Sequence, residues 1–321
     1  MNKIKNFICL FLALLFLPTG SASAAGSIDM NSALSLTISY VDGEMPISGA
    51  EFSAYKIADA KETGELTVNP AFKGYGVEKL INDDASWGLL ASTLEGFVLK
   101  DCVAPLYTGT TDADGKLIFP PEGKALTPGL YLIVGARHEL GGNYYDPTPF
   151  VVMLPAYDSG SDVWLYDVTA NVKFDRESTD TESAARKVIK VWDDKGAEAS
   201  RPKEIKVSLL RDGKVYETVT LNAGNNWRYE WTALDASFSW RVCEDSVPDG
   251  YTSTVTQEGV TFVVTNSAEN PGQDTPTGPS EPEEPKLPQT GQLWWPVPVL
   301  AAAGLLLLLS GLVIKKRDQN E

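Results

Sequence analysis

The chain has 321 residues, a formal net charge of −16 at pH 7 and one histidine, His138. The negative charge argues against nucleic acid or anionic lipid as partners, and one histidine leaves little basis for His-based metal sites or for Ser/His and Cys/His catalysis. The three cysteines, Cys9, Cys102 and Cys243, are too few and too widely spaced for a disulfide framework.

Residues 1–24 have the pattern of a signal peptide. Lys3 and Lys5 precede an apolar run at residues 7–17, and a small-residue cleavage site ends at Ala24. The mature chain is therefore expected to lie outside the cytoplasm, and it is long enough for two domains.

Residues 26–175 are predicted to form a mostly β domain with one inserted helix. Apolar residues alternate over residues 33–57, and further strand patterns follow at residues 117–119, 129–135, 149–154 and 163–174. Within residues 75–100, apolar side chains recur at helical spacing after Ser86, a candidate N-cap. Tyr75, Trp87 and Phe97 could form a ligand platform there, but the amphipathic spacing favours packed core.

Residues 176–183 are polar and are predicted to be a linker. Residues 184–267 then hold short strand patterns spaced as a small antiparallel sandwich requires. The expected strands are residues 187–192, 205–211, 215–221, 227–231, 239–244 and 260–265.

The C-terminal part is read as a stalk followed by a membrane span. Residues 268–286 are rich in proline and acidic residues, which favours an extended, solvated segment. Residues 293–314 are apolar for a length that spans a bilayer as a helix, and the cations at 315–317 favour the cytoplasmic side.

Between the stalk and the span stands Leu287-Pro288-Gln289-Thr290-Gly291. With its flanks, this pentapeptide resembles the LPxTG sorting signal of Gram-positive surface proteins. The resemblance implies that a sortase attacks the Thr290 carbonyl and transfers it to the peptidoglycan cross-bridge or to another pilin subunit. The chain would then be secreted and bound to the membrane only transiently. It would finally be anchored to the peptidoglycan in the cell wall of a Gram-positive bacterium. The alternative is a membrane anchor that contains this pentapeptide by chance.

Residues 184–267 resemble the Cna B-type domain of Gram-positive adhesins and pilins. The resemblance rests on an ordered set of short motifs: Lys190-Val-Trp192-Asp-Asp194, Arg201-Pro202, Asp212-Gly213, Asn226-Trp227-Arg-Tyr229, Val242-Cys-Glu244, Val247-Pro248-Asp249-Gly250-Tyr251 and Val264-Thr-Asn266. It implies an intramolecular isopeptide bond from Lys190 to Asn266, assisted by Glu244 as the acid.

The residue pattern agrees with that implication. Lys190 alternates with Val188 and Trp192, so it should share the core face of its strand. Burial lowers the pKa of an amine and raises that of a carboxyl, which would make Lys190 nucleophilic and Glu244 an acid. The alternative is an ordinary ion pair in which Lys190 reaches an exposed Glu244. Cys243 should point to the opposite sheet face, away from this chemistry.

The first domain resembles a pilin-type relative of the same sandwich. The matching segments are Gly49-Ala50-Glu51-Phe52, Thr111-Asp-Ala-Asp-Gly115, Pro128-Gly129-Leu-Tyr131 and Pro149-Phe150-Val-Val-Met-Leu154-Pro155. Ser39 or Tyr40 falls where the family's lysine would be, and Gly135 where its glutamate would be. We therefore predict no isopeptide bond in this domain.

Lys173 is a candidate acceptor for a sorting signal. Trp164, Val168 and Lys173 have the spacing of the pilin motif WxxxVxVYPK, although residues 170–172 depart from it. The alternative is an ordinary exposed lysine at a strand end.

Other chemistry finds little support. A thioester at Cys102 is excluded because no glutamine occurs between residues 26 and 180. Asp112, Asp114 and Gly115 fit a hairpin turn better than a calcium loop. No metal site, cofactor or enzyme motif is predicted.

The sequence thus predicts two tandem Ig-like β-sandwich domains in a cell-wall-anchored protein. It favours an ancillary or basal pilin-type subunit. The alternative is a stand-alone surface adhesin whose first domain binds a host protein or glycan.

Overall fold

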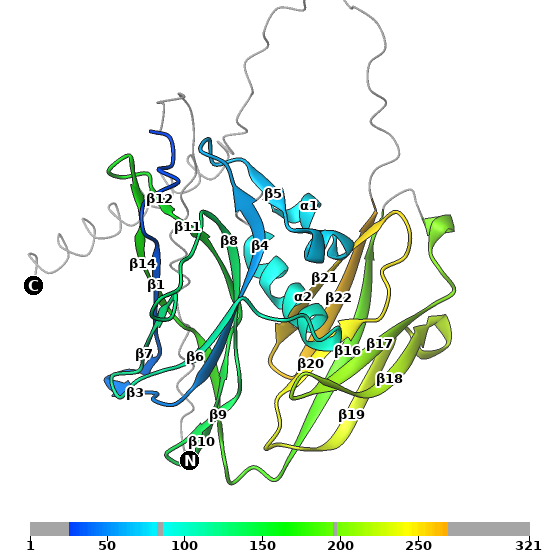
Figure 1. Cartoon of the computed structure of the whole chain (residues 1–321). Helices are drawn as coiled ribbons and strands as arrows, with labels where there is room; N and C mark the ends of the chain where they lie inside the picture. The colour runs from blue at the N-terminus through cyan, green and yellow to red at the C-terminus, as the bar shows by residue number, and fades with distance from the viewer. Residues whose placement is uncertain (1–25, 82–85, 195–197, 269–321) are drawn as a thin grey trace, which may run out of the picture. The chain divides into compact units, whose positions relative to one another are not determined.

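The computed structural model describes residues 26–81, 86–194 and 198–268, and it is dominated by β-strands (Figure 1). These residues belong to one compact unit. They form two sandwiches in chain order, with helices inserted in the first. None of the helices among the described residues is long and apolar enough to span a membrane. The predicted signal peptide, stalk, sorting signal and membrane span lie outside the described residues.

The first sandwich packs a three-stranded sheet, ordered β14-β1-β7, against a five-stranded one, ordered β11-β8-β4-β5 with β6 paired to β4. Smaller sheets are formed by β2 and β3, by β15, β10 and β9, and by β12 and β13. The strands are β1 (Ser35–Ser39), β2 (Val41–Asp42), β3 (Met45–Pro46), β4 (Glu51–Ala60), β5 (Leu66–Val68), β6 (Tyr107–Thr110), β7 (Lys116–Phe119), β8 (Gly129–Gly135), β9 (His138–Leu140), β10 (Asn143–Pro147), β11 (Phe150–Leu154), β12 (Ala156–Asp158), β13 (Val163–Leu165), β14 (Asp167–Asn171) and β15 (Phe174–Ser178).

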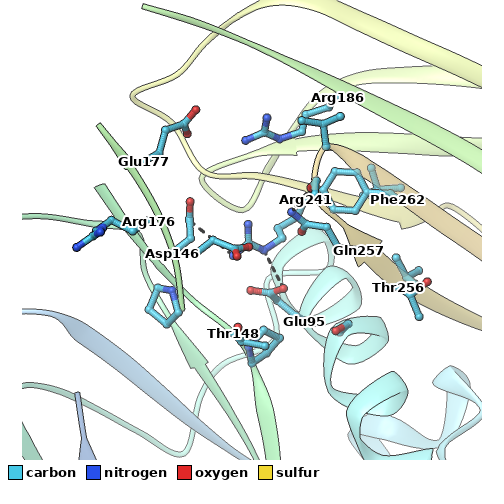
Figure 2. A pocket seen from close by; sticks show the side chains of 18 residues that line it. Glu95, Asp146, Thr148, Arg176, Glu177, Arg186, Arg241, Thr256, Gln257 and Phe262 are labelled. Carbon is cyan, nitrogen blue, oxygen red and sulfur yellow. Dashed lines mark hydrogen bonds and ion pairs between the residues drawn. The ribbon is translucent and has the colours of Figure 1, made fainter. Parts of the chain in front are cut away.

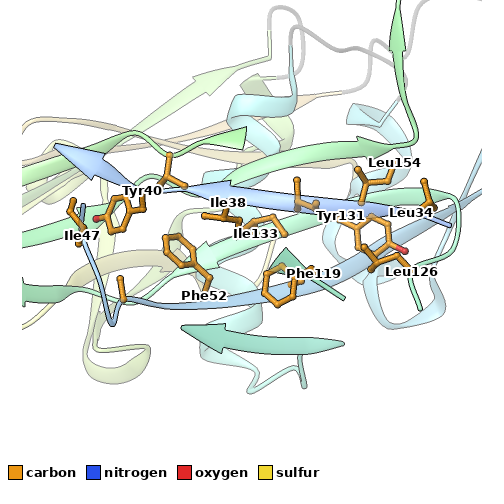
Figure 3. Packing of buried hydrophobic residues seen from close by; sticks show 14 of the residues in the cluster. Leu34, Ile38, Tyr40, Ile47, Phe52, Phe119, Leu126, Tyr131, Ile133 and Leu154 are labelled. Carbon is orange, nitrogen blue, oxygen red and sulfur yellow. The ribbon is translucent and has the colours of Figure 1, made fainter. Parts of the chain in front are cut away.

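The core between these sheets is aromatic and aliphatic (Figure 3). The rings of Tyr40 and Phe52 meet edge to face, with their centres 5.4 Å apart, and Phe119 and Tyr131 are buried with them. The alternating residues of β1 and β4 supply this layer, as a period of two requires.

The helical insertion covers the outer face of the five-stranded sheet. It comprises η1 (Pro70–Tyr75), α1 (Val77–Leu80) and α2 (Trp87–Lys100). Leu90, Leu94 and Val98 of α2 pack with residues of β4 and β8 in a second core, so every residue of β8 is buried. The prediction that this insertion is packed core is confirmed.

The second sandwich has a four-stranded sheet, ordered β19-β16-β22-β21, and a three-stranded sheet, ordered β18-β17-β20. Its elements are β16 (Ser183–Asp193), η3 (Glu198–Ser200), β17 (Glu204–Arg211), β18 (Lys214–Asn222), η4 (Ala223–Asn225), β19 (Arg228–Asp235), β20 (Trp240–Glu244), β21 (Tyr251–Glu258) and β22 (Thr261–Ala268). Its core includes Val188, Trp231, Trp240 and Phe262.

The structure differs from the predicted linker. Residues Phe174–Ser178 form β15, which pairs antiparallel with β10, and β16 already begins at Ser183. Only residues 179–182 connect the sandwiches. The sequence pattern does not reveal β15 because this mostly exposed strand carries polar side chains and lacks an apolar face.

Candidate functional site

The candidate site lies between the first and last strands of the second sandwich. β16 and β22 run parallel, with Lys190 opposite Val264 and Trp192 opposite Asn266. Residues paired in this way project to the same face of a sheet, and Val264 belongs to the hydrophobic core. Lys190 and Asn266 therefore point into the interior from neighbouring strands, two register positions apart.

Lys190 is a buried amine with a side chain only 4% exposed. Its Nζ donates to the backbone oxygens of Val191 at 2.7 Å and Val264 at 3.3 Å, and lies 4.2 Å from the centre of the Trp192 ring. Within the described ranges, it makes no ion pair with a carboxylate. These neutral acceptors stabilise an ammonium far less than a carboxylate would.

Glu244 holds Asn266 from the facing sheet, and both side chains are 0% exposed. Glu244 Oε1 accepts from Asn266 Nδ2 at 3.0 Å, and Oε2 accepts from Ser253 Oγ at 2.7 Å. Asn266 Oδ1 is buried without a hydrogen-bond partner among the described residues. A half-turn of this amide would bring Oδ1 to Glu244, where a protonated carboxyl could donate to it. The alternative of an exposed Lys190–Glu244 ion pair is wrong, because Glu244 is fully enclosed.

Burial controls the protonation of both ionisable groups. It lowers the pKa of Lys190 to about 7, although Glu244 and Asp194 act in the opposite direction. Burial likewise raises the pKa of Glu244, although hydrogen bonds from Ser253 and Asn266 and the nearby Lys190 oppose the shift. Burial therefore favours the neutral amine of Lys190 and the protonated carboxyl of Glu244 over their charged forms.

Two features of the site were missed by sequence reasoning. Ser253 lies on β21, a strand that was not predicted although Tyr251, Ser253 and Val255 alternate with threonines. Asp194 is buried and accepts from Arg201 Nε at 2.8 Å and from the Tyr251 hydroxyl at 2.9 Å. This second cluster fixes the chain beyond the end of β16, and its residues appeared in the sequence motifs without a role.

The second sandwich is similar to a known type of protein domain. A family model described as Cna protein B-type domain matches residues 186–267, which include Lys190, Glu244 and Asn266. Residues 186–267 are a Cna B-type domain. Such domains are non-enzymatic modules of surface proteins, in agreement with the prediction that the chain is not an enzyme.

Other similarities are partial. Over 154 residues the chain is 32% identical to the collagen adhesin of Staphylococcus aureus, covering 42% of this chain and only 12% of the adhesin. The solved B repeat unit of the collagen-binding surface protein Cna of Staphylococcus aureus is 19% identical, with 74% of this chain and 99% of that chain covered and a TM-score of 0.26. The full-length major pilin SpaD from Corynebacterium diphtheriae is 16% identical, with 75% and 66% covered and a TM-score of 0.31.

Cys243 lies on the opposite face of β20 from the Cna B-type core, as predicted. It packs with Phe97 of α2 and Leu210 of β17. Burial raises the pKa of its thiol to about 12, so it is an inert packing residue. Cys102 is exposed, and both cysteines are free.

The first sandwich has no reactive side chains at the corresponding place. β1 also runs parallel to the last strand of its sheet, β14. The buried residues of β1 are Leu36 and Ile38, and Tyr40 just beyond β1 and Val172 just beyond β14 are buried as well. An added Cβ at Gly135 would lie 2.6 Å from the Phe52 ring and from Pro147. Among the described residues of the first sandwich, this core cluster holds neither an amine nor a carboxamide, which supports the prediction of no bond in this domain.

Lys173 is exposed in the two-residue connection between β14 and β15. Its backbone oxygen accepts from the amide of Thr148 at 2.7 Å, so the connection is held to the neighbouring loop. The side chain therefore starts from a fixed point on the surface. The sorting signal, Leu287 to Gly291, lies outside the described residues.

A group of charged side chains joins the first sandwich to the Cna B-type domain (Figure 2). Arg241 Nε of β20 lies 2.9 Å from Glu95 Oε2 of α2, and Arg137 pairs with Asp146 and with Glu177. All of these residues except Arg137 border a cavity of about 450 Å³ that is also lined by Thr256 and Gln257 of β21. Because acids and arginines alternate around it, the cavity has no strong preference for a ligand of either charge.

Proposed function

We propose that the Cna B-type domain carries an intramolecular isopeptide bond between Lys190 and Asn266. The observation that carries the proposal is the complete burial of an amine, a carboxyl and a carboxamide together, which a fold stabilised only by weak contacts has little reason to retain. The Glu244–Asn266 hydrogen bond of 3.0 Å supports Glu244 as the acid.

The chemistry balances without a cofactor. Neutral Lys190 Nζ attacks Asn266 Cγ, while protonated Glu244 donates a hydrogen bond to Oδ1. Glu244 then moves a proton from Nζ to Nδ2, the Cγ–Nδ2 bond breaks, and ammonia leaves. The products are one secondary amide and one molecule of ammonia for each chain, so the step is a single turnover.

Peptide mapping of the full chain tests this proposal. A linked pair of peptides containing Lys190 and Asn266 should appear, about 17 Da lighter than the sum of the two because ammonia is lost. Glu244→Gln should leave the two peptides separate, because a glutamine cannot transfer the proton. Separate peptides in the wild-type chain would reject the bond.

We further propose that sortase attaches the chain at Thr290 to the peptidoglycan or to another subunit. A Cna B-type domain in a relative of a collagen adhesin supports a role at the cell surface. Thr290→Ala should move the protein from the wall fraction to the membrane and medium. A wild-type protein that is not released by muramidase would contradict wall attachment.

For the role at the surface, we propose an ancillary or basal pilin-type subunit. The exposed and anchored position of Lys173 favours it, because an acceptor amine must be reachable by an enzyme. Lys173→Arg should abolish high-mass ladders formed with the cognate sortases, whereas Lys116→Arg, at an exposed position of β7 in the same sandwich, should not. Unchanged ladders would remove the acceptor role.

The second candidate function is a stand-alone adhesin. The similarity to a protein described as a collagen adhesin favours testing binding to collagen, other host proteins and glycans. Binding in the absence of any ladder would favour the adhesin. The helical insertion is a poor ligand platform, because Phe97 is buried and Tyr75 stacks on it at 4.8 Å.

A further inference from the structure

Helix α2 of the first sandwich closes one side of the Cna B-type domain. β20 and β21 are edge strands of its two sheets, and α2 lies beside both (Figure 1). Thr93 Oγ1 accepts the backbone N–H of Val255 in β21 at 2.9 Å, which satisfies a donor that an edge strand would otherwise expose. Lys100 Nζ donates to the backbone oxygen of Asp245, just after β20, at 2.9 Å.

The helix approaches β20 closely because it has a glycine at the contact. A Cβ added to Gly96 would lie 2.9 Å from the backbone oxygen of Val242 and 3.3 Å from Cys243 Cβ. Phe97, the next residue, is buried against Cys243. Gly96 therefore permits the backbone of α2 to touch the backbone of β20, and any larger residue would force the two elements apart.

The strands held by α2 are those that carry the acid of the site. Glu244 is the residue after Cys243, and Ser253 lies two residues before Val255. Glu244 points inward while its neighbour Cys243 packs against Phe97 of α2, since side chains alternate between the faces of a strand. Val255 shares the inward face of β21 with Ser253 and meets α2 through its backbone N–H. The Ser253–Glu244 hydrogen bond of 2.7 Å thus spans the edge that α2 closes.

We propose that α2 is a positioning element for bond formation in the neighbouring domain. Docked on β20 and β21, it fixes the two strands that orient Glu244 toward Asn266 and excludes water from the edge between them. This inference rests on the proposed isopeptide bond and assigns a role in it to the first sandwich. Folding of the first sandwich onto the second would accordingly precede cross-linking.

Gly96→Leu in the full chain tests the proposal. The added side chain should push α2 away from β20 without touching the core that α2 shares with its own sandwich. Gly88→Leu is the matched control, because Gly88 belongs to the same helix and an added Cβ there meets nothing within 4 Å. Phe97→Asp is a second variant that places a charge beside Cys243. Cross-linking is followed by peptide mapping of newly synthesised chains, because the amide, once formed, survives unfolding. Undocking is followed by labelling of Cys243 with a thiol reagent in a Cys102→Ser background.

We expect Gly96→Leu and Phe97→Asp to expose Cys243 and to slow cross-linking at least tenfold, while Gly88→Leu matches wild type. Cross-linking at the wild-type rate in both variants overturns the proposal. A wild-type chain that lacks the linked peptides would instead refute the bond itself, so the two failures are distinguishable.

The pH dependence of the cross-linking rate distinguishes a positioning role of α2 from a general loss of stability in the variant. Glu244 is influenced by Lys190 from β16 and Asp245 after β20, with neutral Ser253 and Asn266 as hydrogen-bond partners, and α2 presents Glu95 paired with Arg241. Admission of water should lower the pKa of Glu244, so the alkaline limb of the rate should move to lower pH in Gly96→Leu. An equal reduction at every pH would overturn the role of α2.

Discussion

The two sandwiches pair their terminal strands in the same way but fill the space between them with different chemistry. β1 lies parallel to β14 in the first, and β16 lies parallel to β22 in the second. The first presents Ile38 and other apolar residues to the core, whereas the second presents Lys190 and Asn266. The same pair of strands can thus be held by packing alone or, as we propose, by a covalent bond. Substitutions in the two sandwiches should therefore destabilise the protein in different ways.

The largest effect is expected for Asn266→Ala. Loss of a cross-link between the first and last strands should lower the free energy of unfolding of the Cna B-type domain by about 4 to 5 kcal/mol in the chain-entropy account. The melting temperature should fall by roughly 20 °C. Calorimetry measures this, and Asn171→Ala, an exposed asparagine on the last strand of the first sandwich, is the control that should change little. Equal stability of Asn266→Ala and wild type would show that no such cross-link supports the domain.

Next in size is Ile38→Ala in the first sandwich. Ile38 is fully buried in the core of that sandwich, so its truncation should cost about 3 kcal/mol through lost burial and a cavity. Hydrogen exchange should accelerate in peptides of β1 and β14, while the linked Lys190–Asn266 peptides stay unchanged. Faster exchange confined to the second sandwich would contradict the assignment of separate cores.

A smaller effect is expected for Ser253→Ala, which removes one hydrogen bond to the buried Glu244 carboxyl. A hydrogen bond to a charged or polarised group contributes about 1.5 kcal/mol, so cross-linking should slow about tenfold. Thr254→Ala, whose half-buried side chain lies on the other face of β21, is the matched control. Equal rates in the two variants would remove Ser253 from the reaction.

The smallest effect concerns pH. Because the pKa of Lys190 is lowered to about 7, its neutral fraction falls as pH drops through that value. The newly synthesised chain should therefore cross-link about fivefold more slowly at pH 6 than at pH 7, because an ammonium cannot attack. Peptide mapping of newly synthesised chains, quenched at successive times at each pH, gives the rate. A rate that rises on acidification would show that Lys190 is not the titrating nucleophile.

Much of this site was predictable because strand alternation is a local property. The spacing of Val188, Lys190 and Trp192 places the amine on the core face, and the structure agrees. Ser253 was not predictable in the same way, since its strand alternates small and polar residues and has no strong apolar period. Its role depends on Glu244, a partner from another sheet.

The contact between the sandwiches was also beyond the sequence patterns. The spacing of apolar residues in α2 predicts one amphipathic face. In the structure, however, Leu94 faces its own sandwich and Phe97 faces the next one. A helix buried on two sides is hard to distinguish from one with a broad apolar stripe. The short connection of residues 179–182, which holds the domains near one another, was likewise concealed by the polar composition of β15.

The hydrogen bond from Val255 to Thr93 also matters for crowded surfaces. An unprotected edge strand invites the strand of a neighbouring copy to add to its sheet, which leads to lateral aggregation. With the Val255 donor satisfied by a helix from the same chain, that part of β21 is closed to strand addition. Densely displayed copies would then be prevented from joining through this edge, independently of any covalent link along the chain.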